Sequence, residues 1–453
     1  MTAIVWFTRD LRVHDHPALS AAAREHEQVI PLFVLDRTIL TSTYHRPNRA
    51  RFLHDSLRDL SASLRDLGAG LVVREGEVVE EVVRLARQFE VSCVYASADV
   101  SAYAARRAAA VSRALAGERR TLRQLPGVTV LAPGEAIPAG GDHFAVFTPY
   151  FRRWTELPKR ATLPPPDRLR LPAGLRRGRI PARGTLCTGT RAPELPEGGE
   201  TAGRGRLQEW LSGGVDDYAD GHDDLAGDRT SRLSPYLHFG CLSPTEIVAR
   251  ADLRRRGAPE FVRQLAWRDF HHQVLAARPG AATSDYRPRG DRWRADPQAF
   301  AAWAQGRTGY PIVDAGMRQL LREGWMHNRA RLLTASFLAK DLYLDWRVGA
   351  RHFLEHLVDG DVANNQLNWQ WVAGTGTDTR PNRVLNPLRQ AERYDPDGSY
   401  VRRYLPELSE VSGSAVHSPW ELPTGQRLQL DYPEPIIDHQ LAAQRFRAAR
   451  GKN

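Results

Sequence analysis

The chain has 453 residues, of which 63 are Lys or Arg and 53 are Asp or Glu, which gives a formal net charge of +10. This length allows two or three domains with separate cores. The basic balance suits a polyanionic partner, although an Arg-rich composition alone produces the same charge. The three cysteines are far apart and form no CxxC pair, which argues against a disulfide framework or a thiolate metal site.

The N-terminus reads as a strand rather than a signal peptide, and no apolar run approaches the roughly 18 residues of a membrane span. Together with the cysteine usage, this predicts a cytoplasmic protein with no membrane partner. We also expect a monomer.

Short apolar runs alternate with amphipathic stretches over residues 1–132, the first predicted domain. The runs predict buried strands, at 3–7, 29–35, 71–76, 91–97 and 128–131. Between them, residues 49–67 predict a helix with one apolar face. This alternation predicts a parallel sheet covered on both faces by helices. The domain has no GxGxxG or Walker sequence, so we expect no conventional dinucleotide or NTP site in it.

Residues 133–202 are predicted to be an interdomain linker, because from residue 157 onward they are rich in Pro, Gly and Arg without an apolar period. From 203 to 453 the pattern is helical almost throughout, for example at 326–340 and 347–358. The predicted fold class is therefore an α/β N-terminal domain followed by an all-α C-terminal domain.

The segment 359–371 concentrates side chains that suit a flat ligand with polar edges. It contains two carboxylates, three consecutive amides and two indoles. Aromatic faces and amides are typical of a pocket for such a ligand. A helix with two core tryptophans and a polar face remains the alternative.

This segment and its continuation, DGDVANNQLNWQWVAGTGTDT at 359–379, resemble the flavin-binding signature of the photolyase/cryptochrome family, the light-driven DNA repair enzymes and their photoreceptor relatives. Further similar stretches follow in the family's order: WFTRDLRVHDHPAL (6–19), TSRLSPYLHFG (230–240), QLAWRDF (264–270), TGYPIVDAGMRQL (308–320), GWMHNRARLLTASFLAKDLYLDWR (324–347) and DYPEPIIDHQ (431–440). The resemblance covers nearly the whole chain. It implies an antenna-binding function for 1–132, an FAD- and DNA-binding function for 203–453, and UV-damaged DNA as the partner.

The resemblance also implies which residues bind FAD. Four residues match the family's pyrophosphate contacts: Thr230, Ser231, Leu233 and Ser234. A helix start is well suited to phosphate, although an ordinary capping motif has the same letters. Other matches are Tyr218 on the cofactor, Asp359 and Asp361 near the ribityl chain and ring edge, Asn365 opposite flavin N5, and Asn328, Arg331 and Arg268 beside the ring.

By the same resemblance, two indoles form the wall against which a flipped-out pyrimidine dimer packs, Trp267 and Trp371. Gln264 and Leu332 belong to the same substrate site, and Arg329 is expected to contact DNA phosphate. A chain of three tryptophans matches the family's electron path to the flavin: Trp293, Trp346 and Trp369. For each of these tryptophans a purely structural role remains the alternative.

Two departures from the family's pattern bear on the reaction. Repair enzymes for cyclobutane dimers usually have Glu at the position of Gln264 and Met at the position of Leu332. An amide still donates hydrogen bonds but relays no proton. The first hypothesis is a class I cyclobutane pyrimidine dimer photolyase. The alternatives are a cryptochrome-like photoreceptor without repair activity, against which Asn365 and the lack of a long C-terminal extension speak, a (6-4) photoproduct enzyme, and a nucleic-acid-binding protein without flavin.

The antenna expected from the resemblance is an 8-hydroxy-deazaflavin rather than a folate, with Arg49 and Asp99 as candidate contacts. Surface charges on helices explain the same letters. One further motif, HFLEH at 352–356, fits a zinc-hydrolase pattern. Five-residue matches arise easily by chance in a chain with 15 histidines, so no metal is expected.

Overall fold

The computed structural model describes residues 1–451, which fold into two compact units. Unit 1 comprises three stretches of the chain, Met1–Thr190, Pro196–Ala219 and Ser231–Pro279. Among the described residues, unit 2 comprises Arg191–Leu195, Asp220–Thr230 and 280–451. The predicted boundaries at 132/133 and 202/203 stay a prediction. Among residues 1–451, no helix combines the length and the apolar character that crossing a membrane requires.

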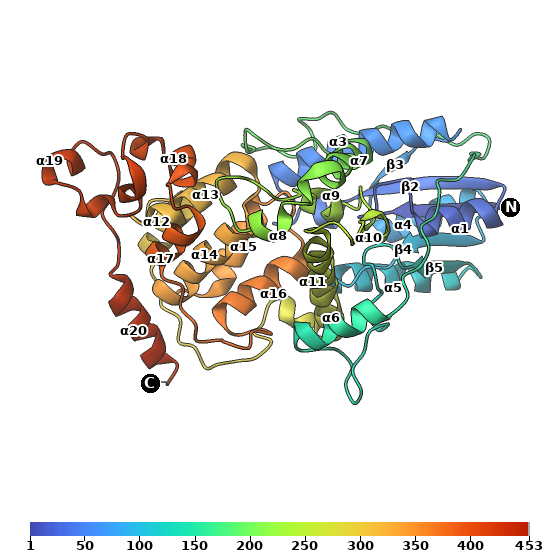
Figure 1. Cartoon of the computed structure of the whole chain (residues 1–453). Coiled ribbons are helices and arrows are strands. Elements are labelled where there is room, and N and C mark those ends of the chain that lie inside the picture. Colours follow the sequence, from blue (N-terminus) through green and yellow to red (C-terminus); the bar gives the residue numbers. More distant parts are fainter. Residues whose placement is uncertain (452–453) are drawn as a thin grey trace. The chain divides into compact units, whose positions relative to one another are not determined.

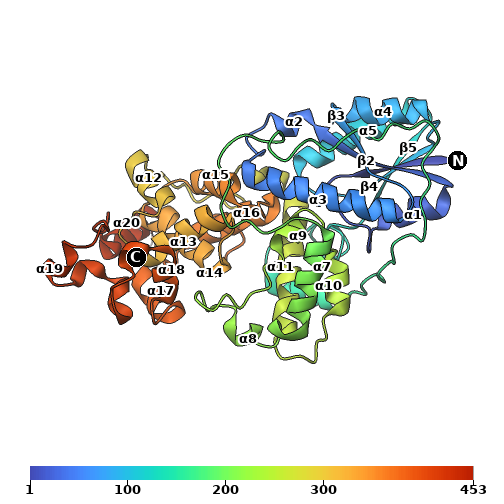
Figure 2. The ribbon, with the colours of Figure 1, turned by 90° about the horizontal axis from the view of Figure 1, so that it is seen from above.

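Unit 1 contains a five-stranded parallel sheet with the order β3-β2-β1-β4-β5. Its strands are β1 (Thr2–Phe7), β2 (Gln28–Asp36), β3 (Val72–Gly76), β4 (Cys93–Ser97) and β5 (Thr121–Leu125). All six residues of the central strand β1 are buried, as expected for a strand with helices on both faces. Figure 2 shows α1 (Pro17–Glu25) on one side of the sheet, and α4 (Val78–Gln88) and α5 (Ala102–Ala116) on the other.

The remaining helices of unit 1 follow in chain order: α2 (Arg37–Leu40), α3 (Pro47–Asp66), α6 (Phe147–Glu156), α7 (Glu200–Glu209), α9 (Ser234–His238), α10 (Pro244–Arg250) and α11 (Ala258–Ala277). The helix predicted at 49–67 is α3, which begins at a proline, where the ring fits the first turn. A π-helical turn (Trp210–Gly214) follows α7, and α8 (Tyr218–Gly221) spans a unit boundary.

The strand predicted at 128–131 is wrong. The fifth strand is β5, which pairs in parallel with β4 at the edge of the sheet. Its sequence TLRQL is mostly exposed and has few apolar side chains, so it lacks the pattern of a buried strand. The apolar run at 128–131, which follows β5 in the sequence, has that pattern and therefore predicts a strand instead.

The loop at 128–131 is held by side chains of α11 instead of by a neighbouring strand. The carbonyl of Val128 accepts a hydrogen bond from Arg268 Nη1 at 2.5 Å. The amides of Val130 and Leu131 each donate to Asp269 Oδ2 at 3.0 Å. Since these side chains satisfy the buried backbone groups, the loop needs no strand partner.

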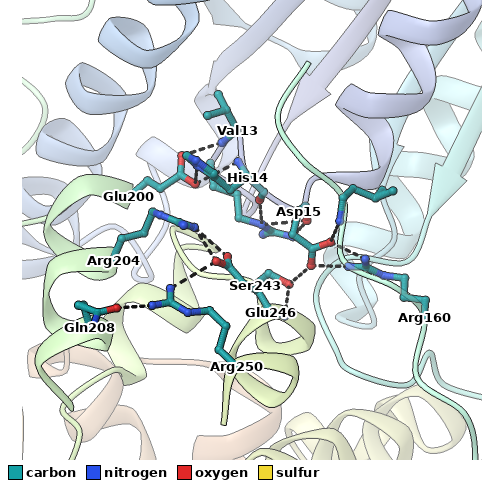
Figure 3. Close-up of polar contacts among 12 residues, drawn as sticks. Val13, His14, Asp15, Arg160, Glu200, Arg204, Gln208, Ser243, Glu246 and Arg250 are labelled. Carbon is teal, nitrogen blue, oxygen red and sulfur yellow. Dashed lines mark hydrogen bonds and ion pairs between the residues drawn. The ribbon is translucent and has the colours of Figure 1, made fainter. Parts of the chain in front are cut away.

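Polar contacts also tie the loop after β1 to α7 and α10 (Figure 3). Glu200, the first residue of α7, accepts hydrogen bonds from the amides of Val13 at 2.7 Å and His14 at 3.1 Å. Asp15 binds Arg160 and accepts from the hydroxyl of Ser243, the N-cap residue of α10. These contacts explain why helices from the predicted C-terminal domain belong to the same compact unit as the sheet.

Unit 2 is helical (Figure 1). It has its own hydrophobic core. Its helices are α12 (Pro297–Gln305), α13 (Pro311–Glu323), α14 (Asn328–Ser336), α15 (Trp346–His356), α16 (Val362–Ala373), α17 (Pro387–Tyr394), α18 (Ser399–Tyr404), α19 (Thr424–Arg427) and α20 (His439–Ala449). The helix predicted at 326–340 is α14 followed by a π-helical turn (Phe337–Asp341), and the one at 347–358 is α15. The predicted fold class, α/β followed by helices, is confirmed.

Candidate functional site

A pocket in unit 2 gathers most of the side chains predicted to face the flavin ring. It encloses about 480 Å³ of space, part of it open to solvent, and lies among α14, α15, α16 and the loop between the last two. Its lining residues are Asn328, Arg331, Leu332, Ala335, Phe353, Leu357, Asp359, Asn364, Asn365, Asn368, Trp369 and Val372.

A charge pair lies at the edge of this pocket. Arg331 Nη2 is 2.8 Å from Asp359 Oδ2, and Arg331 Nε donates to the carbonyl of Met326 at 2.8 Å. The carboxylate is buried, with 2% of its side chain exposed, while the guanidinium is one-quarter exposed. The other carboxylate oxygen, Asp359 Oδ1, is buried and has no hydrogen-bond partner among residues 1–451. The guanidinium thus fixes the carboxylate and leaves one oxygen for another donor.

Helix α16 positions Asn365. The side chain of Asp361 caps this helix by accepting from the Asn364 amide at 2.8 Å, and the helix ends at Gly374 in the left-handed conformation (φ 78°). Asn365 lines the pocket and is buried, with its Nδ2 donating to the carbonyl of Ala350 at 3.0 Å. Asp361 therefore serves as a capping residue here, besides its predicted role near the ribityl chain.

The residues of the pocket fit a flavin. Their side chains combine apolar and aromatic walls with amides, a guanidinium and a carboxylate, as a flat ring with polar edges requires. An unsatisfied buried carboxylate oxygen costs about 1–3 kcal/mol. A ligand N–H or O–H placed at Asp359 Oδ1 would remove this cost.

Trp369 lies between this pocket and the core of unit 2. Its indole makes edge-to-face contacts with Phe353 (ring centroids 4.9 Å apart) and with Trp303 (6.1 Å). Trp303 is fully buried and its Nε1 donates to the carbonyl of Thr334 at 2.9 Å. Trp303 could not be singled out from the sequence, because it lies outside the motifs on which the resemblance depends.

The other two tryptophans of the predicted electron path differ in exposure. Trp346, the first residue of α15, is fully buried and its Nε1 donates to Asp285 Oδ1 at 2.8 Å. Trp293 is half-buried and packs against Tyr343, with ring centroids 5.1 Å apart. The proposed relay through Trp293, Trp346 and Trp369 stays a prediction.

The predicted pyrophosphate residues of unit 1 precede the short helix α9. Ser234 begins this helix, as the sequence predicted, and Ser231 Oγ accepts from the amide of Leu233 at 3.4 Å. Arg232, between the two, has a left-handed backbone (φ 52°), which is rare for a residue with a long side chain. Tyr218 is buried, with edge-to-face contacts to Trp210 and Phe261. Thr230 belongs to unit 2 by its contacts.

Trp267 stacks on a residue that the sequence did not indicate. The indole lies parallel to the ring of Phe147, with centroids 3.6 Å apart and an interplanar angle of 7°. Phe147 in turn stacks on Phe151 at 5.5 Å, and the guanidinium of Arg263 lies over both phenyl rings at 5.4 and 5.2 Å. Helix α6 thus supplies an aromatic backing for Trp267. The signal in the sequence was the aromatic spacing of FTPYF within the predicted linker.

Two further residues of α11 have different surroundings. Gln264 is exposed, and its Nε2 approaches the carbonyl of Glu260 at 3.4 Å. Arg268 is buried and its guanidinium binds the carbonyls of Val128 and Leu237. Arg268 therefore organises backbone within unit 1, and its predicted contact with the flavin stays a prediction.

Three residues of unit 2 that are predicted to contact the substrate lie on α14 and α16. Arg329 forms a two-pronged ion pair with Asp223, at 2.6 and 2.7 Å, and lies over the ring of Tyr394 at 4.4 Å. Leu332 lines the pocket, while Trp371 is half-buried and packs against the core of unit 2. An Arg329 held by a carboxylate has less charge to offer to a phosphate, and its predicted role stays a prediction.

The candidate antenna residues also have partners within unit 1. The buried guanidinium of Arg49 lies over the ring of Tyr44 at 4.3 Å and binds its carbonyl. Asp99 accepts from the amide of Val100 at 2.6 Å and lies 3.6 Å from Arg9 Nη1. Neither contact distinguishes an antenna site from ordinary surface packing.

Comparisons with known proteins cover both parts of the chain. The family model described as the FAD binding domain of DNA photolyase matches residues 261–452, and the one described as DNA photolyase matches residues 3–168. The chain is 57% identical to a deoxyribodipyrimidine photo-lyase of Streptomyces griseus over 452 residues, which is 99% of both chains. Residues 261–452 thus carry the FAD-binding domain.

Two solved structures are similar over nearly the full length. One is a bacterial class III photolyase from Agrobacterium tumefaciens, with a TM-score of 0.92 and 33% identity over 99% of this chain and 97% of that one. The other is a cryptochrome from Synechocystis, with a TM-score of 0.92 and 30% identity over 99% of both chains. Pocket, fold and sequence agree, and the chain belongs to the photolyase/cryptochrome family.

Proposed function

We propose that this protein repairs UV-damaged DNA by splitting cyclobutane pyrimidine dimers in a light-driven reaction. The observation that carries the proposal is the 57% identity, over 99% of both chains, to a relative named deoxyribodipyrimidine photo-lyase. The pocket of unit 2 supports it, because its polar and aromatic lining fits the flavin that this chemistry needs. The class I assignment made from the sequence stays a prediction.

Reduced FAD, when bound, supplies the photoexcited electron that splits the cyclobutane ring and accepts that electron back. The chain's part is to hold and tune the cofactor. In this proposal the guanidinium of Arg331, whose charge Asp359 partly balances, lies beside the ring and favours an anionic reduced form. Asp359 offers Oδ1 to a donor of the ligand, and Asn365 provides a neutral amide at the ring edge. Ser231, Ser234 and Tyr218 are the proposed contacts of the remainder of the cofactor.

Each of Trp267 and Trp371 is proposed to offer an aromatic face to an extruded base. Base stacking on an aromatic ring is worth about 1–3 kcal/mol, and extrusion costs a few kcal/mol, least for a damaged base. Recognition of damage follows from that difference. Gln264, which is exposed, donates hydrogen bonds to pyrimidine carbonyls in this proposal.

Binding to DNA is expected to depend steeply on salt. The chain carries a net charge of +10, and each phosphate that its Lys and Arg side chains neutralise contributes about −0.9 to the slope of log K against log salt. Because Arg329 is paired with Asp223, we expect other basic side chains to carry most of this slope.

The decisive experiment measures loss of thymine dimers from an irradiated oligonucleotide under blue light, with purified, chemically reduced protein. The expected result is repair in the light and none in the dark. A Trp267→Ala variant is expected to retain FAD and to repair more slowly at low substrate concentration. Absence of light-dependent repair by a fully FAD-loaded protein would contradict the proposal.

A cryptochrome-like photoreceptor is the second candidate, favoured by Gln264 and by the similarity to the Synechocystis cryptochrome. A Gln264→Glu variant separates the two candidates. Under the repair proposal it splits dimers at least as fast as the natural chain, whereas a photoreceptor gains no repair from this change. A (6-4) photoproduct substrate, tested in parallel, is expected to remain unrepaired, because Asn328 and Leu332 stand where that reaction needs histidines.

An antenna chromophore of the 8-hydroxy-deazaflavin type remains part of the proposal, with Arg49 and Asp99 as its contacts. An absorption spectrum after denaturation, followed by chromatography of the released chromophores, tests it. A second chromophore of folate or flavin type would correct the identity of the antenna. A monomer in solution is expected from light scattering.

A further inference from the structure

Three side chains converge at the C-terminal end of α15. His352, Glu355 and His356 occupy positions i, i+3 and i+4, which share one face of a helix. One possible ligand atom from each lies within 4.8 Å of the others. The two imidazole rings have centroids 4.6 Å apart and an interplanar angle of 54°. The sequence motif that seemed a chance match to a zinc site is thus assembled in space.

We propose that these residues form a binding site for a divalent transition metal ion of the Zn²⁺ class. Two imidazoles and one carboxylate are a common zinc ligand set, and a fourth position is then left to water. Tetrahedral zinc needs ligand atoms about 3.4 Å apart for bonds of about 2.1 Å. The possible ligand atoms lie within 4.8 Å of one another, so binding requires side-chain rotations that bring them to that separation. Imidazole ligands select against Mg²⁺ and Ca²⁺, which prefer oxygen.

The surroundings of His352 support a site rather than a chance cluster. Its Nε2 is buried and has no hydrogen-bond partner among the residues that the structure describes. Its ring is held by edge-on contacts with Trp303 at 5.4 Å and Phe300 at 6.0 Å. A histidine that is fixed by aromatic neighbours loses little conformational freedom when it binds a metal. All three side chains are half-buried, so an ion can still enter from solvent.

The proposed metal site is separate from the flavin pocket. Phe353 and Leu357 line that pocket, whereas none of the three proposed ligands does. A bound ion would join two turns at the end of α15, just before the loop that carries Asp359. We therefore expect metal binding to stabilise unit 2 without replacing any flavin contact.

The test uses full-length, tag-free holoprotein with Cys187→Ser, which removes the half-buried thiol as a competing ligand. Zn²⁺ alone is titrated by calorimetry, and bound zinc is counted after equilibrium dialysis. One Zn²⁺ per chain is expected, with a Kd of roughly 1 μM or lower. His356→Ala is expected to weaken Zn²⁺ binding by more than about tenfold. Mutation of residues that only hydrogen-bond to metal ligands already weakens metal binding about tenfold or more.

His143→Ala is the matched control, because its imidazole lies beside Asp142 and outside the cluster. This control is expected to bind Zn²⁺ as the parent does. Glu355→Gln keeps the shape of the side chain and decides the matter if His356→Ala does not fold, which circular dichroism and flavin content report. Absence of Zn²⁺ binding, or binding that Glu355→Gln and His356→Ala leave unchanged, would overturn the proposal.

Discussion

The pair of Arg331 and Asp359 sets the charge of the flavin pocket. The carboxylate is almost fully buried, and the guanidinium 2.8 Å away offsets the cost of taking it out of water. The same contact leaves Oδ1 of the carboxylate directed to no protein donor among residues 1–451. In the proposed flavin site, this single side-chain pair links the stability of unit 2 to cofactor binding.

Replacing Arg331 by Met should lower both properties. Breaking a buried pair costs about 3–5 kcal/mol, and partial exposure of the guanidinium reduces this to an expected loss of about 1–3 kcal/mol in the free energy of unfolding. Urea denaturation measures that loss, and the ratio of flavin to protein absorbance measures retained FAD. The control is Arg322→Met on α13, which removes an exposed ion pair with Glu194. This variant should change neither the free energy of unfolding nor the FAD content. Full FAD retention in Arg331→Met would exclude its proposed role.

Phe147 is predicted to position Trp267 for the substrate. Aromatic pairs contribute about 0.5–1.5 kcal/mol beyond burial, so Phe147→Leu should weaken binding of a dimer-containing oligonucleotide by roughly 2- to 13-fold. Fluorescence anisotropy measures this Kd. Phe147→Tyr keeps the stacked ring and should bind as the natural chain does. Equal weakening for undamaged DNA would mean that Phe147 acts on general DNA binding instead.

At this scale the sequence was informative wherever a motif existed. Arg331, Asp359, Asn365 and Trp369 line one pocket, and the roles that the resemblance implies for them stay predictions. Phe147 and Trp303 were missed because stacking depends on the path of the backbone, which spacing along the chain does not reveal. The pairing of Arg329 with Asp223 was missed for the same reason.

At the scale of elements, α7 shows how a helix start can fasten a loop. Glu200 is 3% exposed. Its carboxylate accepts hydrogen bonds from two backbone amides and contacts the imidazole of His14 (Figure 3). A helix N-terminus favours a carboxylate, and this one also satisfies donors of a loop nearly 190 positions earlier. The sequence predicted a helical stretch from 203 onward, but it gave no sign of this contact.

Glu200→Ala should therefore destabilise unit 1. It leaves the buried amide of Val13 and the part-buried amide of His14 without this acceptor. A buried amide without an acceptor costs about 1–3 kcal/mol, so we expect a loss of about 2–4 kcal/mol in the free energy of unfolding. Glu209→Ala, at the other end of the same helix, removes an exposed pair with Arg206 and should cost less than about 1 kcal/mol. Thermal unfolding of both variants compares them. Equal midpoints would show that water replaces the lost acceptor.

The fifth strand shows where apolar periodicity fails to predict a strand. The sequence pattern predicts it at 128–131, whereas the structure has it at β5. Four of five strands and the long helix α3 followed from apolar patterning, because burial on both faces leaves a continuous signal. An edge strand is partly solvated and lacks that signal. The apolar residues Val128, Val130 and Leu131 are buried, and the backbone of their loop is hydrogen-bonded to side chains of α11 rather than to a strand.

At the scale of the whole molecule, buried carboxylates make stability depend on pH. Burial raises the pKa of Asp269, Asp314 and Asp341 to about 6 in each case. A carboxyl with a raised pKa in the folded state adds stability that is present below its unfolded pKa and disappears as pH rises through the folded one. Asp15 acts in the opposite sense: although burial raises its pKa, hydrogen bonds from Arg160 and Ser243 hold it below the usual value.

Comparison with Asp269→Asn isolates one of these contributions. As pH rises from about 4 to about 6, the natural chain should lose up to about 1.4 kcal/mol per pH unit relative to the variant. Urea unfolding followed by circular dichroism at several pH values measures the difference. Asp167→Asn, at an exposed carboxylate, should show none. A difference that grows in the natural chain's favour as pH rises would contradict the assignment.

Each unit is made of several separate stretches of the chain, and this affects how the protein folds during synthesis. Unit 1 extends to Pro279, and two short stretches of unit 2 precede that residue in the sequence. A ribosome therefore releases all five strands long before α11 emerges to hold the loop at 128–131. Until α11 emerges, the loop at 128–131 lacks its hydrogen bonds to that helix. Chaperone binding during translation should therefore be most frequent between the emergence of β5 and that of α11.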